Sequence, residues 1–199
     1  MEYKQFPADL IPLETTISLN QPSFSFESEF TGVEQNIYHP GARWLIEMNF
    51  NTLTEQKWRR LSVFLNDLQG KSGVCAITEH SREGTPAKGM PYVSGDGQTG
   101  RQLVTAGWKP RQLVLKLGDL ITVNDELKEV NEDVWSDAIG AATFTFNPPL
   151  RKSPPNSEPI VTINPYVVVK LDMDSVARTN QAMSLATFDT LKFSEVIYK

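Results

Sequence analysis

The stretch that decides the fold class spans residues 113–151, LVLKLGDLITVNDELKEVNEDVWSDAIGAATFTFNPPLR. It is typical of a strand, a tight turn at Gly118 and Asp119, a second strand and a short polar hairpin. An alternating strand follows, and we expect it to stop at Pro148 and Pro149. No residue in this stretch has the makings of a catalytic group. The stretch therefore predicts a β-structured scaffold element rather than an enzyme core.

Period-two alternation continues through most of the chain, including residues 23–30, 42–50, 141–146 and 161–171. Successive side chains of a strand point to opposite faces, so this pattern predicts one buried face and one face exposed to solvent. In residues 23–30 it places Phe24 and Phe26, and with them Phe30, near one face. In residues 42–50 the predicted inner face consists of Trp44, Ile46, Met48 and Phe50.

One amphipathic helix is predicted over about residues 54–69. Thr52 and Glu55 have the spacing of a capping box, and Gly70 is a natural stop. The predicted buried stripe consists of Trp58, Leu61, Phe64, Leu65 and Leu68. A short second helical turn is expected within residues 175–187, with an exposed arm over 172–190 as the alternative. Residues 192–198 are predicted to form a closing strand.

These patterns predict a mainly β fold, a β-sandwich or split β-barrel with one helix. We expect one domain over residues 1–199, with a small loop or hairpin insertion at about 71–112. Residues 81–100 are rich in glycine and proline and must be loop or short hairpin.

Composition excludes several function classes. The net charge of −5 argues against general affinity for nucleic acid, which needs a basic face. The single cysteine, Cys75, forbids an internal disulfide and lies in an apolar run that predicts a buried, inert thiol. The sequence has no apolar leader and no run long enough to span a membrane, so we expect neither export by a leader nor membrane insertion.

No catalytic, cofactor-binding or metal-binding residue is predicted. His39 and His80 lack the spacing of a zinc site, and we interpret them as a turn residue and a surface ion-pair residue. Residues 95–100, GDGQTG, lack the lysine and helix of a phosphate-binding loop and are interpreted as a mobile hairpin tip. The acidic side chains within residues 125–133 are interpreted as a solvated hairpin.

A series of weak motifs in a fixed order carries a family resemblance over roughly residues 30–172. In chain order the motifs are residues 41–44 (GARW), a helix ending at 65–70 (LNDLQG), a glycine-rich stretch with Pro91 and Gly95, 99–103 (TGRQL), 115–120 (LKLGDL), 140–143 (GAAT) and 148–151 (PPLR). Together they resemble the minor tail proteins of long-tailed bacteriophages, in particular the distal tail, or tail hub, type. The first thirty residues and the segment after Asp172 match nothing in this pattern.

The resemblance implies a structural virion protein, assembled in the host cytoplasm, that forms a ring with copies of itself, commonly a hexamer. Such a ring joins the tail tube to the tail tip or baseplate, and genomic DNA passes through its lumen without specific binding. An acidic lumen would repel DNA, which the net charge allows. A ring closes through head-to-tail contacts between unlike surfaces.

Two other functions remain open at this stage. A carbohydrate-binding module of a host-recognition apparatus would need an exposed aromatic platform, for which Tyr92, Trp108 and Trp135 are the candidates. An enzyme ranks below it, because no catalytic constellation is visible in the sequence.

Overall fold

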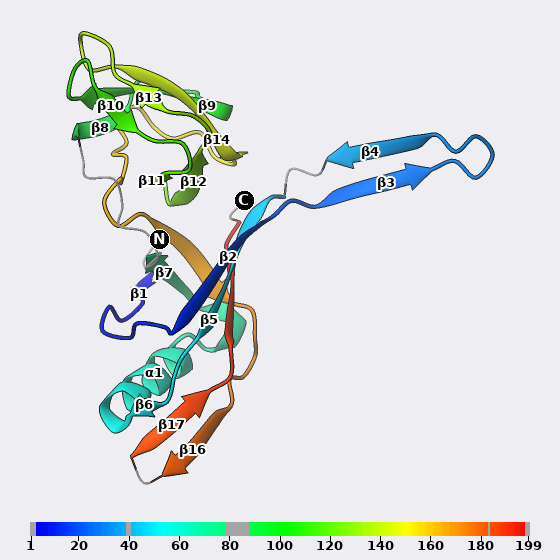
Figure 1. Ribbon diagram of the computed structural model, residues 1–199, viewed down its shortest axis with the longest axis vertical. Coiled ribbons are helices and arrows are strands. Elements are labelled where there is room, and N and C mark those ends of the chain that lie inside the picture. The colour runs from blue at the N-terminus through cyan, green and yellow to red at the C-terminus, as the bar shows by residue number, and fades with distance from the viewer. Residues whose placement is uncertain (1–2, 39–40, 79–87, 183, 198–199) are drawn as a thin grey trace.

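The computed structural model describes residues 3–38, 41–78, 88–182 and 184–197. The fold is mainly β with one α-helix, as predicted. Two packed units stand one above the other, and a two-stranded hairpin projects sideways between them (Figure 1). We call residues 88–165 the upper unit. The lower unit comprises the other described residues apart from that hairpin.

The lower unit is built on a six-stranded sheet in the order β1-β7-β15-β18-β5-β2. In that order the strands are β1 (Lys4–Gln5), β7 (Val74–Thr78), β15 (Tyr166–Leu171), β18 (Leu191–Glu195), β5 (Arg43–Asn49) and β2 (Glu14–Asn20). Only the β1–β7 pair is parallel among these described strands. The predicted inner face of β5 is confirmed, because Trp44, Ile46 and Met48, together with Phe50 just beyond the strand, are buried.

Helix α1 (Glu55–Asp67) packs its apolar stripe into the core of this unit, which confirms the helix predicted over residues 54–69. Leu61, Phe64, Leu65 and Leu68 are buried, and Trp58 is half-buried. The predicted capping box is wrong. Thr54 is the N-cap and makes no side-chain cap hydrogen bond, while the Thr52 hydroxyl instead donates to Gln181 Oε1 at 3.2 Å.

The left-handed residue that ends the helix comes one position earlier than the predicted stop at Gly70. Gln69, not Gly70, takes the first left-handed conformation after the helix, with φ 53°. Gly70 opens the 3₁₀ turn η1 (Gly70–Ser72), and Gly73 then returns to the helix end, where its N–H donates to Leu68 O at 2.8 Å. A Cβ at Gly73 would stand 2.4 Å from that oxygen, so this close approach requires glycine.

A small antiparallel sheet, β16-β17-β6, lies beside the helix. Its strands are β6 (Leu53–Thr54), β16 (Arg178–Ala182) and β17 (Leu185–Phe188). The helical turn expected within residues 175–187 is therefore wrong, since this segment is a hairpin paired with β6. The predicted closing strand is confirmed as β18.

The upper unit holds a five-stranded antiparallel sheet in the order β11-β12-β14-β9-β8 and a small β10-β13 pair. The strands are β8 (Gly89–Val93), β9 (Gly100–Trp108), β10 (Leu113–Leu115), β11 (Leu120–Val123), β12 (Glu126–Val130), β13 (Val134–Trp135) and β14 (Ala142–Leu150). The strands predicted in residues 113–151 are confirmed, although β14 runs through Pro148 and Pro149 instead of stopping there.

The turns of the upper unit follow local sequence rules. Gly118 has φ +81°, and Asp119 closes the turn by accepting the Lys116 N–H at 2.7 Å. Asn124 and Asp125 both have positive φ and join β11 to β12 as a two-residue hairpin. In residues 81–100 the described part is a hairpin, since residues 94–99 connect β8 to β9.

The chain leaves the lower sheet after β7 and returns to it at β15, a strand that pairs with β7. Each unit has its own buried cluster, but Leu120 and Leu127 of the upper unit belong to the cluster of the lower unit. The indole N–H of Trp44 donates to Leu127 O at 3.0 Å. The two units are therefore in close packed contact. Within the described residues, no helix is long and apolar enough to cross a membrane.

Trp44 lies at the centre of this arrangement, so we expect Trp44→Ala to lower the free energy of unfolding by roughly 3–5 kcal/mol, as large core deletions do. Urea unfolding followed by circular dichroism measures the loss. Trp135→Ala is the matched control, because Trp135 is 65% exposed and should cost far less. A loss below about 1 kcal/mol for Trp44→Ala would contradict the core role.

Candidate functional site

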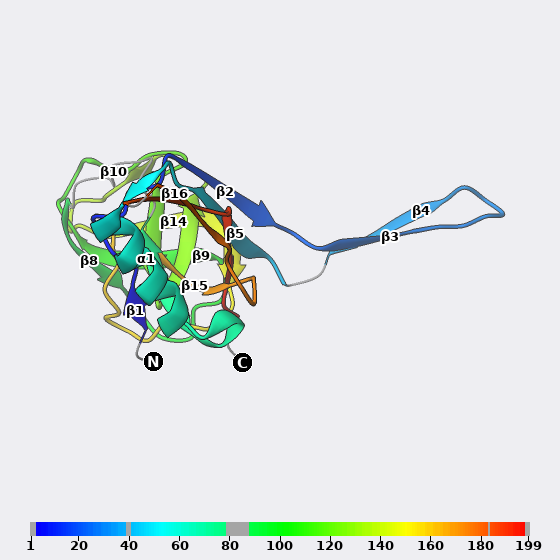
Figure 2. The same cartoon turned by 90° about the horizontal axis from the view of Figure 1, so that it is seen from below.

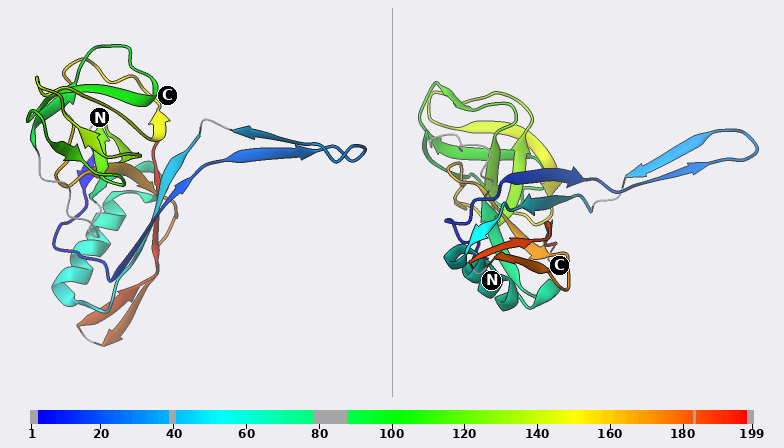
Figure 3. Two further views of the ribbon diagram at one scale, coloured as in Figure 1. Left: turned by 45° about the horizontal axis from the view of Figure 1, so that its top comes forward. Right: turned by 60° about the horizontal axis from the view of Figure 1, so that its bottom comes forward.

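The hairpin that projects from the body is the most distinctive surface of the protein. Strands β3 (Ser23–Glu27) and β4 (Glu34–Tyr38) pair only with each other. They continue the ladder of β2 and β5, whose last pair is Asn20 with Arg43. All views show this hairpin extending away from both units (Figures 1, 2 and 3). We call it the arm.

The two faces of the arm differ in polarity. Residues directly opposite each other on paired strands point to the same face. Phe24 stands opposite Ile37, and Phe26 opposite Gln35, so one face is largely apolar. The other face carries Ser25, Glu27, Glu34 and Asn36. On that polar face, the Ser25 hydroxyl donates to Glu34 Oε1 at 2.5 Å.

The apolar face of the arm is not covered by the body. Phe24 is 55% exposed, Phe26 58% and Phe30, at the tip, 97%. Ile37 and Val33 are also exposed. The sequence placed Phe24 and Phe26 on one face correctly, but the expectation that this face is buried is wrong within one chain. The reason is tertiary, since none of the helices and strands that the structure describes packs on this face of the arm.

A second exposed apolar surface lies at β8 in the upper unit. It is a shallow groove of about 420 Å³, and it is lined mainly by Met90, Tyr92, Pro159 and Ile163. Met90 is 86% exposed and Ile163 53%. We call it the β8 groove. Part of its backbone is already hydrogen-bonded, because Ile160 N–H donates to Pro91 O at 2.9 Å.

Tyr92 is fixed in this groove by a glycine. Gly107 on the neighbouring strand β9 has φ +84°, and a Cβ there would meet the Tyr92 ring at 2.9 Å. The ring therefore lies directly against the backbone of Gly107, which a side chain would prevent. Tyr92 is 39% exposed, so it packs against β9 while presenting part of its surface to solvent.

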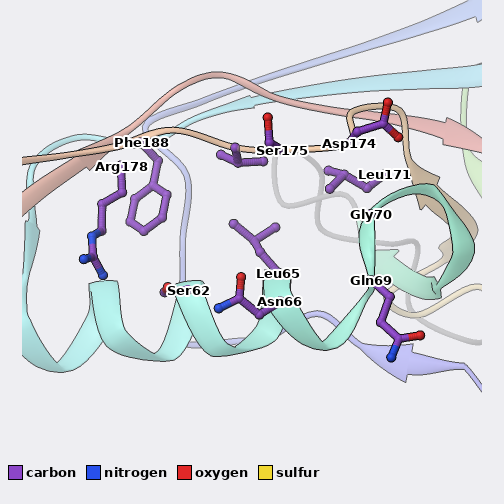
Figure 4. A pocket seen from close by; sticks show the side chains of 11 residues that line it. Ser62, Leu65, Asn66, Gln69, Gly70, Leu171, Asp174, Ser175, Arg178 and Phe188 are labelled. Atoms are coloured by element: carbon purple, nitrogen blue, oxygen red, sulfur yellow. The ribbon is translucent and has the colours of Figure 1, made fainter.

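A polar pocket of about 520 Å³ separates α1 from the segment leading into β16 (Figure 4). Ser62 and Asn66 line it from the helix and Gln69 from the turn after the helix, and Asp174 and Arg178 line it from the other side. The guanidinium of Arg178 stacks over the Trp58 ring at 4.3 Å, and Asp174 pairs with Lys71 at 3.4 Å. Arg178 and Asp174 are thus engaged in structural contacts.

The junction between the units contains a buried ionic network, which the sequence did not reveal. Arg151, at the end of β14, donates to both carboxylate oxygens of Glu195 on β18, at 2.7 and 2.5 Å. Its Nη2 also donates to Ala42 O at 2.8 Å. Glu195 accepts a further hydrogen bond from Trp44 N–H at 3.0 Å. One buried carboxylate therefore joins the upper unit to β5 and β18.

A second buried pair lies next to this one. Lys128 is fully buried, and its Nζ donates to Glu126 Oε2 at 2.6 Å and to Pro149 O at 2.9 Å. Burial lowers the pKa of Lys128, and Glu126 opposes that effect. Glu126 also accepts backbone N–H groups from Arg151 and Lys152. The expected solvated hairpin over 125–133 is therefore wrong at Glu126 and Lys128.

Three polar side chains link the N-terminal segment to the upper unit. Asp125 Oδ1 accepts hydrogen bonds from the hydroxyls of Tyr166, at 2.8 Å, and Tyr3, at 3.1 Å. Burial, followed by the hydrogen bonds to Tyr3 and Asp125, raises the pKa of Tyr166. Both phenols stay protonated donors at neutral pH, so this cluster has a structural role.

The remaining sequence candidates are placed as follows. Cys75 is fully buried, and burial raises the pKa of its thiol to about 12, which agrees with an inert thiol. His39 and His80 lie outside the described residues. Of the three candidate platform aromatics, Trp108 is buried, Tyr92 is partly exposed and Trp135 is the most exposed.

Metal and phosphate chemistry find no support in the described part of the chain. Its His, Cys, Asp and Glu side chains form no cluster of three or more that could hold a metal ion. The tip at residues 94–99 is held together by its own side chains, since Gln98 Nε2 donates to Ser94 O at 2.9 Å and Gln98 Oε1 accepts Val104 N–H at 2.7 Å.

No protein-family model and no curated protein matches this sequence. The structural features that bear on function are the apolar arm, the apolar β8 groove and the buried junction between the two units.

The junction network predicts a charge-specific loss of stability. Glu195→Gln keeps the shape of the side chain but removes the carboxylate that makes the bidentate contact with Arg151, and Glu195 itself is 1% exposed. We expect a loss of roughly 3–5 kcal/mol in the free energy of unfolding, measured by urea denaturation at neutral pH.

Glu47→Gln is the matched control, because Glu47 pairs with Lys192 on the surface at 3.2 Å. We expect that change to cost at most about 1 kcal/mol. Equal effects of the two substitutions would show that the buried pair has no special role at the junction.

Proposed function

We propose that this protein is a structural subunit of a phage tail. In this proposal it assembles with copies of itself into a ring of about six subunits that joins the tail tube to the tail tip or baseplate. The ordered motifs in residues 41–151 support the family, and the arm supports self-assembly.

The observation that carries the proposal is the uncovered apolar face of the arm. An isolated two-stranded hairpin is only marginally stable in water, and beyond its base on β2 and β5 no further described strand pairs with this one. Full burial of an exposed side chain of this kind contributes roughly 1.5–3 kcal/mol, and because Phe24, Phe26 and Ile37 are about half exposed, covering them would contribute about half of that for each. A neighbouring molecule that covers them would stabilise the arm and gain binding energy at the same time.

The direction of the arm favours a head-to-tail neighbour. The arm leaves from one side of the body in every view, so it reaches a molecule that lies beside the first (Figures 1 and 2). Contacts of this kind use two unlike surfaces and produce a ring when the rotation between neighbours closes. The acidic net charge suits a lumen that lets DNA through.

We expect the double substitution Phe24→Ser/Phe26→Ser to abolish or strongly weaken self-association, because it removes the apolar face. Light scattering after size-exclusion chromatography measures the mass, and electron microscopy shows whether rings form. The body should remain folded, since the arm contributes nothing to either core.

Ser25→Ala/Asn36→Ala is the matched control on the polar face of the same two strands and should assemble like the unchanged protein. A protein that stays monomeric at every concentration up to about 1 mM would contradict self-assembly, because even weak specific contacts populate oligomers there.

Carbohydrate binding is the second candidate function, and the exposure of Trp135 is the observation that favours it. The other tryptophans are buried, as Trp44 and Trp108 are, or half-buried beneath Arg178, as Trp58 is. An exposed indole ring is a suitable platform for the apolar face of a sugar.

If the protein binds sugars, tryptophan fluorescence should change saturably on titration with cell-wall oligosaccharides, and Trp135→Phe should remove most of that change. Trp58→Phe is the control, because its ring is covered by Arg178. An unchanged spectrum across the oligosaccharide series would count against this second function.

A further inference from the structure

We infer that the apolar face of the arm binds in the β8 groove of the next copy of this chain. This inference rests on the proposed self-assembly and identifies the two surfaces that meet. Phe24, Phe26 and Ile37 supply one surface, and Met90, Tyr92, Pro159 and Ile163 supply the other.

The two surfaces match in chemistry. Both are apolar, and the side chains of both are exposed in a single chain. The backbone beneath the groove is already hydrogen-bonded, since Val93 N–H donates to Glu158 O at 2.9 Å and Ile160 N–H donates to Pro91 O. Contact therefore desolvates few polar groups, and the apolar side chains can meet at little cost.

The two surfaces also lie where a head-to-tail contact needs them. In Figure 1 the arm points to the right, and β8 is on the left of the upper unit. The view from below agrees, with β8 and the arm again on opposite sides (Figure 2). A neighbour placed beyond the arm tip therefore turns its β8 side towards the arm. Repetition of this contact uses one donor surface and one acceptor surface per copy.

The polar pocket beside α1 is a less favourable binding site for the arm than the β8 groove. Its rim carries Asn66, Gln69 and Arg178, and apolar rings placed over them would remove these polar groups from water without replacing their hydrogen bonds (Figure 4). The β8 groove imposes a smaller cost, because its lining is mostly Met, Pro, Ile and Tyr, with Ser157 and Thr162 as its polar side chains.

The area of the arm face is smaller than the area that a stable interface needs. Five strand residues extend roughly 17 Å, and two paired strands with their side chains span roughly 10 Å, so the arm face measures on the order of 170 Å². A stable interface needs about 800 Å² from each partner. The arm therefore fixes which surfaces meet, and the flanks of the neighbouring bodies must supply the remaining area.

Disulfide trapping between two single-cysteine variants tests this inference. Phe26→Cys places a thiol on the apolar face of the arm, and Met90→Cys places one in the groove. Cys75 can stay, because it is fully buried. On mild oxidation, the mixture should give a covalent dimer of twice the chain mass that neither variant gives alone. Asn36→Cys, on the polar face of the arm, should not cross-link to Met90→Cys.

Association of a groove variant separates this inference from the proposed function. Met90→Asp/Ile163→Asp should raise the dissociation constant of self-association by about tenfold or more, as the loss of interface anchors does. Val63→Asp, on the exposed side of α1, is the control and should leave it unchanged.

Each outcome is decisive. A mixed disulfide together with weakened association supports the inference. Self-association that depends on Phe24 and Phe26 but not on Met90 and Ile163, with no mixed disulfide, would overturn the groove as the seat and leave self-assembly standing. Absence of any self-association would overturn both.

Discussion

The bidentate contact between Arg151 and Glu195 is the interaction on which the rest of the structure depends. It joins the residue that follows β14 in the upper unit to β18 in the lower sheet, and Glu195 also accepts a hydrogen bond from Trp44 on β5. The arm emerges from the ladder of β5 and β2, while the β8 groove belongs to the upper unit. This buried ion pair, with the Trp44 indole contact to Leu127 O beside it, therefore helps to fix the position of the arm relative to the groove.

Burying this many charges has a cost, and the geometry shows how it is offset. A buried ion pair is stabilising only when nearly every donor and acceptor is used. Glu195 accepts three hydrogen bonds, and Glu126 accepts three from Lys128 and two backbone N–H groups. An apolar junction could give equal stability, but two apolar surfaces can slide over each other. The directional contacts instead favour a single orientation of the units.

The elements that the sequence predicted are those whose local pattern and tertiary surroundings agree. In residues 42–50 the alternation and the burial coincide, and along α1 the helical stripe lies against the sheet. The turns at Gly118 and Asn124 have positive φ, and glycine and asparagine are residue types that tolerate it, so the local sequence is enough to indicate these turns. Residues 175–187 were mistaken for helix because their weak local pattern is overridden by pairing with β6. In that segment the partner strand, not the local sequence, decides the structure.

The candidate surfaces were harder to predict, because the missing information lies between segments distant in sequence. Residues 23–27 alternate as residues 43–49 do, yet the apolar face of the first strand is exposed and that of the second is buried. Lys128 sits in a run of charged residues, and only the distant carbonyl of Pro149 and the nearby Glu126 make its burial possible. Met90 and Ile163 are far apart in the chain, so no sequence window contains the β8 groove.

The contrast between the exposed strand β3 and the buried strand β5 indicates what the apolar face of the arm is for. A strand that alternates apolar and polar residues buries its apolar face when another element packs on it. Strand β5 is an example, because its apolar face lies in the core of the lower unit. Glu27 and Glu34 on the opposite face keep the arm polar on one side, which limits indiscriminate pairing with other strand edges. An arm that is apolar on one side only is suited to a single orientation against a partner. In the proposed assembly a neighbouring molecule supplies the layer that covers this face, and the junction between the units sets where that molecule lies.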